Sequence, residues 1–193
     1  MANPDRDNGL RPVGTIGASA WNGAVRKYQV ADRSADTTNS HGHLFIGDPC
    51  KLSSGKVLAA NSNDTILGVV VQIGYESSVN DGVGPYNPGD LTAMYAPLTV
   101  ATGYYAWVAL ADNTVFEIQS ASDLDLAVGA PADLNTAANT AHGSTTTGQS
   151  TCELTTASNN DVLVVEIPEY PDNDSTLANT RYHVTFVKTV FEQ

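Results

Sequence analysis

Residues 181–191 read RYHVTFVKTVF, and their alternation of apolar and polar side chains decides the fold class. Successive side chains of a strand point to opposite faces of a sheet, so Tyr182, Val184, Phe186 and Val190 fall on one side of an extended chain. β-Branched and aromatic residues also favour strands over helices. The segment therefore predicts a β-strand with one buried face.

Similar runs recur along the chain between clusters of Gly, Asn, Pro and Asp, which are residues typical of turns. Residues 133–143 are the one helix candidate, but their Asn and Thr content favours a loop or a short turn. Short, regularly spaced strands are typical of a sandwich or barrel. We predict an all-β protein with a single β-sandwich or barrel-like body over residues 25–193. The further predicted strands are 25–31, 43–47, 50–54, 56–60, 65–74, 91–100, 104–110, 114–120 and 162–168.

Residues 1–24 differ from this body, because Asn, Gly and Pro are dense there and neither a helical nor a strand period is present. The sequence predicts an extended, irregular N-terminal arm, with a disordered terminus as the alternative. An extended arm can add backbone hydrogen bonds and anchoring side chains to a partner without a core of its own. The candidate contact residues of the arm are Arg6, Leu10, Arg11, Pro12, Ile16 and Trp21.

The net charge and its distribution along the chain limit the classes of partner that the protein is expected to bind. The chain has 21 acidic and 9 basic residues, a formal net charge of −12, and no Lys or Arg between Lys56 and Arg181. Such a body repels phosphate backbones and anionic lipids, so we expect neither a nucleic-acid nor a membrane partner. Arg6 and Arg11 in the arm suit charge-assisted bonds to carboxylates or carbonyls of another protein.

The cysteines and the N-terminal sequence indicate the cellular compartment in which we expect the protein to fold. Cys50 and Cys152 are the only cysteines, which implies no disulfide framework, and we expect free thiols in a reducing cytoplasm. The N-terminus lacks the basic start and apolar core of a signal peptide. No run approaches the ~20 apolar residues of a membrane span. The sequence therefore predicts synthesis in the cytoplasm without classical export.

Catalytic signatures are missing from the sequence: it has no G-x-S-x-G elbow, Walker loop, dinucleotide fingerprint, H-E-x-x-H or C-x-x-C. Glu166 and Glu169 could form an acid–base pair, but carboxylate pairs are too common to establish catalysis alone. We expect a protein that is not an enzyme, with a β-sandwich hydrolase as the least favoured alternative.

Metal ligands are also sparse. A soft cation would need His41 and His43 to be joined by distant residues of the fold, and neither acidic cluster has the spacing of an EF-hand. We therefore expect no metal and no cofactor. The residues considered are His41, His43, His183 and Cys50 for a soft cation, and Asp123, Asp125, Asp172, Asn173 and Asp174 for calcium.

Aromatic side chains leave one further alternative open, a carbohydrate-binding or adhesin-like module, because aromatic rings can stack on sugars. Tyr and Trp in strands are more often packed in the core or across strands. The aromatic candidates for sugar stacking are Tyr75, Tyr86, Tyr95, Tyr104, Tyr105 and Trp107.

Several stretches, in order along nearly the whole chain, resemble the decoration (cement) proteins of tailed-bacteriophage heads. They are MANPDRDNGLRPVGTIGASAWNGAVRKYQV (1–30), LFIGDPCKLSSG (44–55), NDTILGVVVQIGY (63–75), TVFEIQ (114–119), GAPADLNTAAN (129–139) and DNDSTLANTRYHVTFVKT (172–189). The resemblance implies a structural virion protein that binds the major capsid protein on the outside of the assembled head and stabilises it. It also implies a homo-oligomer, with a trimer as the expected state.

Overall fold

The computed structural model describes residues 2–6, 8–17, 19–32, 43–75, 95–97, 103–136 and 143–191. Every regular element in these ranges is a β-strand, which confirms the predicted all-β class. None of the described residues belongs to a helix that could cross a membrane. The strands are β1 (Arg11–Thr15), β2 (Arg26–Gln29), β3 (Pro49–Ser53), β4 (Lys56–Ala59), β5 (Gly68–Tyr75), β6 (Tyr104–Leu110), β7 (Thr114–Gln119), β8 (Pro131–Leu134), β9 (Leu154–Thr155), β10 (Val162–Glu166) and β11 (Arg181–Phe186).

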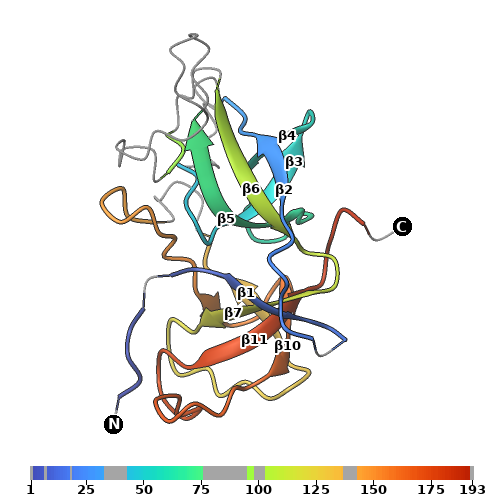
Figure 1. The fold of residues 1–193 in the computed structure, drawn as a ribbon. Helices are drawn as coiled ribbons and strands as arrows, with labels where there is room; N and C mark the ends of the chain where they lie inside the picture. The colour runs from blue at the N-terminus through green and yellow to red at the C-terminus, as the bar shows by residue number, and fades with distance from the viewer. Residues whose placement is uncertain are drawn as a thin grey trace.

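Two antiparallel sheets form a sandwich-like body (Figure 1). The six-stranded sheet has the order β1-β7-β11-β10-β8-β9, and the five-stranded sheet has the order β2-β6-β5-β3-β4. A bridge between Val30 and Val57 joins the two outer strands of the five-stranded sheet at one end, so this sheet curls toward a barrel. The chain passes from one sheet to the other between β6 and β7.

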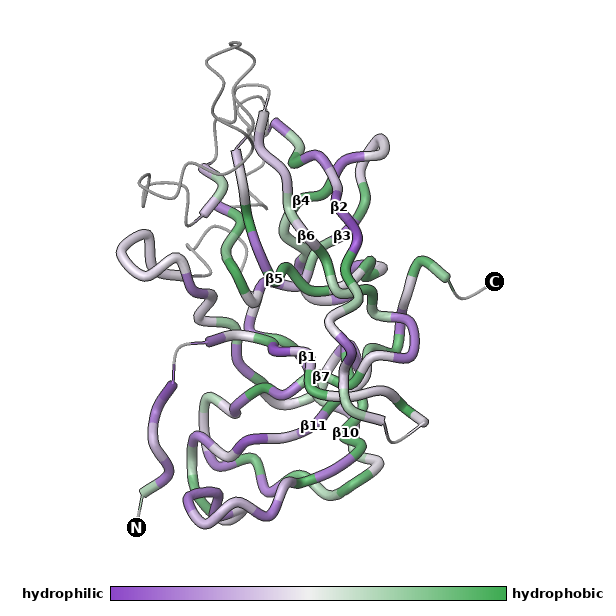
Figure 2. Tube along the Cα trace, viewed as in Figure 1, coloured by the Kyte–Doolittle hydropathy of each residue, from purple (hydrophilic) through white to green (hydrophobic). Residues whose placement is uncertain are grey.

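Two hydrophobic clusters fill the body, and β5 and β6 contribute to both. Val69 and Ala109 face the first cluster, which lies against Phe116 and Tyr182 of the six-stranded sheet. Val70 and Val108 face the second cluster. Because neighbouring residues of a strand point to opposite faces, both faces of β5 are buried, which explains its nearly continuous apolar sequence. Figure 2 shows hydrophobic residues along these strands and where the sheets meet.

Most predicted strands are confirmed, and the exceptions have physical reasons. Residues 43–47 form only isolated bridges, through Leu44 and Ile46. Of the predicted strand 91–100, only 95–97 lie within the described residues, and there Ala96 bridges Leu44. Strands β1, β8 and β9 were not predicted, because β1 and β8 are short and contain Pro or Gly, and β9 has only two residues, which is too few for a period. The confirmed predictions are 25–31, 50–54, 56–60, 65–74, 104–110, 114–120, 162–168 and 181–191.

The N-terminal segment is extended, as predicted, and it is also bonded to the body. After an irregular stretch it forms β1, which pairs with β7 at the edge of the six-stranded sheet. Leu10 is only 2% exposed and belongs to the core between the sheets. Gly9 has φ +58°, and a Cβ there would lie 2.6 Å from both the Gly47 carbonyl oxygen and the Ser150 Cβ. The segment therefore fits closely against two loops of the body.

Candidate functional site

The Glu117 network is a group of charged and polar side chains centred on the nearly buried carboxylate of Glu117 in β7. Arg11 of β1 donates to Glu117 Oε1, and the Tyr170 hydroxyl donates to Oε2 at 3.1 Å. His183 of β11 places Nε2 at 3.6 Å from Oε2 and Nδ1 at 2.8 Å from Glu166 Oε2. The network thereby connects β1 to β7, to β11 on the far side of β7, and to the segment that follows β10.

A second set of contacts extends this network to the start of the chain. Arg6 Nη2 lies 3.0 Å from Asp172 Oδ2, and Arg181 donates to Asp172 Oδ1. Arg181 also lies over the Tyr170 ring, 4.4 Å from its centroid. Asn3 donates to the carbonyl oxygen of Asp174 at 2.9 Å and accepts from its backbone N–H at 2.8 Å. Residues 3–11 are therefore held by the body's own polar groups.

The electrostatics of the network suit a structural role. Burial alone raises the pKa of Glu117, but His183, Arg11, Tyr170 and Arg181 outweigh it and lower the pKa from 4.5 to about 2. The Glu117 carboxylate raises the pKa of His183, burial opposes this shift, and Glu166 adds to the rise. A carboxylate with a pKa near 2 is a weak base at neutral pH, and both of its oxygens already accept hydrogen bonds.

The residues considered for metals are mostly engaged elsewhere. Asp172 pairs with two arginines, and the side chain of Asn173 bonds the backbone of Pro168 and Arg181. His41 lies outside the described residues, and His43 packs edge-on against Phe45 and Tyr95. Within the described part of the chain, no three His, Cys, Asp or Glu side chains are grouped as a metal site.

Both thiols are free, as predicted, and the structure shows that both are buried. Burial raises the pKa of Cys50 and of Cys152, and the negative charge of Asp48 adds to both shifts. Neither thiol is therefore a ready nucleophile or metal ligand at neutral pH, because these roles require the thiolate.

The aromatic candidates lie in separate groups. Tyr75 and Tyr104 pack with ring centroids 4.9 Å apart, while Tyr105 and Trp107 lie together beneath the ammonium group of Lys27. Tyr95 packs against His43 and Phe45, and Tyr86 lies outside the described residues. Lys27 Nζ lies 4.0 Å from the Tyr105 ring centroid and so covers one face of this ring.

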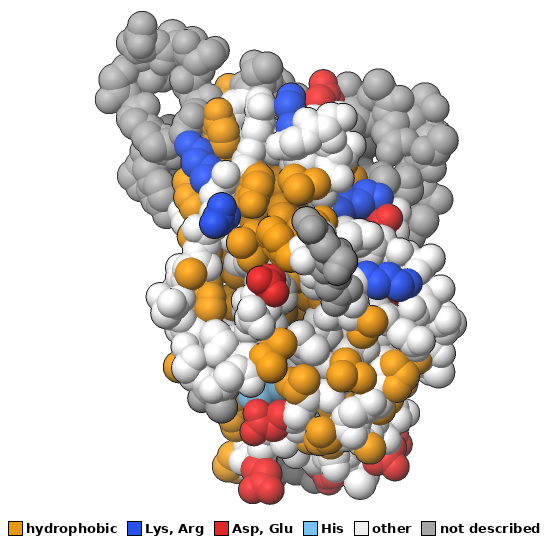
Figure 3. All heavy atoms as spheres, turned by 90° about the vertical axis from the view of Figure 1, so that its right-hand side faces the viewer, with side chains coloured by type: hydrophobic (Ala, Val, Ile, Leu, Met, Phe, Trp, Pro, Cys, Tyr) orange, Lys and Arg blue, Asp and Glu red, His pale blue; other side chains and the backbone are white. Residues whose placement is uncertain are grey.

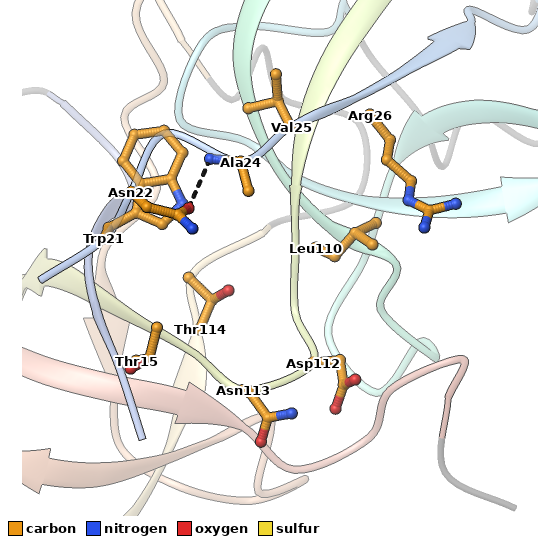
Figure 4. A pocket seen from close by; sticks show the side chains of 10 residues that line it. All are labelled: Thr15, Trp21, Asn22, Ala24, Val25, Arg26, Leu110, Asp112, Asn113 and Thr114. Carbon is orange, nitrogen blue, oxygen red and sulfur yellow. Dashed lines mark hydrogen bonds between the residues drawn. The ribbon is translucent and has the colours of Figure 1, made fainter. Parts of the chain in front are cut away.

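A different feature, the junction cleft, opens where the N-terminal segment passes from β1 to β2 beside the turn between β6 and β7. Its volume is about 360 Å³, near the lower end of the range for ligand pockets. Figure 4 shows Trp21 and Asn22 on one side of the cleft, with Leu110 and Asp112 across from them. The lining residues are Thr15, Trp21, Asn22, Ala24, Val25, Arg26, Leu110, Asp112, Asn113 and Thr114.

The polar side chains of the cleft contrast with those of the Glu117 network, because most have no partner among the residues that the structure describes. In the described structure, the side chains of Arg26, Asp112, Asn113 and Thr114 form no hydrogen bond or ion pair. Asn22 uses its Oδ1 to accept from the Ala24 N–H at 3.0 Å. A turn residue fixes the floor of the cleft, since Asn113 has φ +59° and its carbonyl oxygen accepts from the Ile16 N–H.

Apolar side chains remain exposed around the cleft. Ile16 is 57% exposed and Val25 is 38% exposed, and Trp21 is half-buried against the core. Figure 3 shows hydrophobic side chains gathered in the upper half of one face, with Lys and Arg side chains beside them. Four basic residues lie on strands of the five-stranded sheet, which forms this half of the molecule: Arg26, Lys27, Lys51 and Lys56.

The structure divides the six candidate contact residues of the arm into two groups. Leu10 is in the core, so it is not available to a partner in this fold, and Arg6 and Arg11 pair with carboxylates of the body. Pro12 is half-buried in β1, whereas Ile16 and Trp21 reach the surface near the junction cleft. Sequence reasoning missed Asp112 and Asn113, whose only signal was a turn between two predicted strands, and Thr114, which begins the predicted strand 114–120.

Comparison of the chain with protein-family models, with curated proteins and with solved structures finds no significant match.

Proposed function

We propose that this protein is a structural virion protein that decorates the outside of a tailed-bacteriophage head and stabilises it by binding the major capsid protein. The observation that carries the proposal is the face around the junction cleft, where Ile16 and Val25 are exposed near a half-buried Trp21 and an Arg26 side chain that has no partner in the described part of the chain. Contiguous exposed apolar side chains bordered by polar ones are typical of surfaces that bind other proteins.

Two further features support the same role. They are the all-β body and the stretches that resemble decoration proteins in order along the chain. A cementing protein needs a stable body and an adhesive surface, and the body has two buried clusters and an N-terminal segment bonded firmly to it. The protein acts as a homo-oligomer, with a trimer as the expected state. It is made in the cytoplasm of the host and ends up on the capsid surface.

The test is binding of the purified protein to assembled heads that lack it. We expect saturable binding, a number of copies fixed by the symmetry of the shell, and a higher temperature at which the decorated heads release their contents. Cryo-electron microscopy of decorated heads would then locate the protein on the outer surface. Heads that bind no protein at any concentration would contradict the proposed function.

A further inference from the structure

We propose that the junction cleft receives an extended peptide segment of the capsid protein, with one apolar side chain seated against Trp21, Val25 and Leu110. This inference rests on the proposed function and names the part of the surface that makes the contact. The occupant is a polypeptide because the cleft offers apolar walls and unpaired polar groups in the same small space.

The unpaired groups suit the alternating donors and acceptors of a peptide backbone. Asp112 can only accept hydrogen bonds when ionised, and Arg26 can only donate them. The side chain of Asn113 can do both, and so can the hydroxyl of Thr114. An extended segment presents N–H and C=O groups at regular intervals, so it can satisfy several of these side chains at once.

The size of the cleft and its surroundings favour a protein segment over a small ligand. A volume of about 360 Å³ accommodates one large side chain with part of its backbone. Ile16 is 57% exposed and does not line the cleft, so a saccharide bound there would leave it exposed to water, whereas a larger protein surface would cover it as well. Anchoring residues that fill a pocket and are ringed by weaker contacts carry most of the free energy of many protein interfaces.

The location of the cleft also suits an attachment point. It is built jointly by the segment between β1 and β2 and by the turn between β6 and β7, so it bridges the two sheets. The hydrogen bond from Ile16 N–H to the Asn113 carbonyl oxygen, 3.0 Å long, joins these two walls. A ligand at this point contacts a site held by both halves of the body, and little ordering of the protein is needed on binding.

The experiment compares two exposed valines. Val25 is 38% exposed in the cleft, and Val187 is 37% exposed outside it. Titration of full-length protein onto heads that lack it should give at least tenfold weaker binding for Val25→Asp, about 1.4 kcal/mol, and an unchanged affinity for Val187→Asp. Asp112→Ala should weaken binding in the same direction by a smaller factor. Urea unfolding of each variant establishes that it is folded.

A second measurement observes the cleft directly. In a Trp107→Phe background, Trp21 is the only tryptophan, and its emission should shift to shorter wavelength when heads are added, because the bound segment excludes water. Wild-type protein that binds no heads would overturn the proposed function and this inference together. Normal binding by Val25→Asp and an unchanged Trp21 emission would overturn the inference alone. A saturable Trp21 response to millimolar glucose, galactose or N-acetylglucosamine would overturn it in favour of a glycan site.

Discussion

The N-terminal segment contributes residues to both the Glu117 network and the junction cleft. The polar side chains are bonded to one another in the network, whereas most of those in the cleft have no partner among the described residues. In the network, Arg11 of β1 pairs with Glu117 of β7, the Tyr170 hydroxyl also bonds Glu117, and Arg6 pairs with Asp172. In the cleft, Arg26 and Asp112 line one space, and neither has a partner in the described structure. Paired buried charges are costly to disturb, whereas unpaired exposed groups contribute little to folding and remain available for binding. The first region therefore holds the fold, and the second is suited to recognition.

The largest expected effect tests whether the N-terminal segment is part of the fold. The sequence predicted that residues 25–193 fold without the arm. The structure leads to a different expectation, because deletion of residues 2–20 removes β1, buried Leu10 and the Arg11–Glu117 pair. We expect a loss of ~5 kcal/mol or more, which corresponds to a fall in Tm of roughly 10–20 °C for a chain of this size. Calorimetry of the truncated protein measures it, and a melting transition like that of the full chain would show that the segment is a separable arm.

A smaller change separates the two regions within this segment. Leu10→Ala should lower the free energy of unfolding by about 2–5 kcal/mol, because it leaves a cavity between the sheets. Ile16→Ala, at a side chain that is 57% exposed, should change stability by no more than about 0.5 kcal/mol. Urea unfolding of both variants checks the contrast. Equal losses would mean that the segment is not divided into a buried and an exposed part.

The pH dependence of stability isolates the Glu117 network. The pKa of Glu117 is lowered from 4.5 to about 2, so its contribution is complete above pH 4.5 and is lost as the pH falls toward 2. This contribution amounts to ~3 kcal/mol by linkage. The pKa of His183 is raised above 6.5, so its contribution is complete below pH 6.5 and is lost as the pH rises through the folded pKa.

The network should therefore stabilise the fold most between about pH 4.5 and 6.5. Glu117→Gln should flatten a plot of unfolding free energy against pH on both its acidic and its neutral side. The substitution removes the carboxylate that titrates on the acidic side and that raises the pKa of His183 on the neutral side. Glu169→Gln, at an exposed residue, is the control and should retain the wild-type shape of the plot. A Glu117→Gln profile identical to the wild-type profile would show that other groups govern the pH dependence.

The smallest expected effect on stability lies in the cleft. Asp112→Asn removes a charge that has no partner in the described structure, so the free energy of unfolding should stay within about 0.5 kcal/mol of the wild-type value. Thermal melts at low and high salt measure it. A loss of 2 kcal/mol or more, the size expected for a buried hydrogen bond to a charged group, would mean that Asp112 supports the fold and that the two regions do not differ.

The sequence by itself determined the fold class and most of the strands. Alternation in residues 181–191 and the apolar run at 65–74 are local properties, and a strand with one or two buried faces has to show them. It also distinguished the N-terminal region from the rest of the chain, because neither regular period is present there and basic residues gather in it. The free thiols were predicted from the cysteine count and the expected reducing compartment, whereas their burial came from the structure.

Only the tertiary structure decided how the N-terminal residues are used. Arg11 and Glu117 are 106 residues apart, and Arg6 and Asp172 are 166 apart, so no local pattern could pair them. The same holds for the junction cleft, whose walls come from two distant turns. Sequence patterns report the period and polarity of one segment at a time, whereas pairing and cleft formation depend on which segments the sheet order brings together. For that reason Leu10 lies in the core and Ile16 at the surface, although both are large aliphatic residues of the same segment.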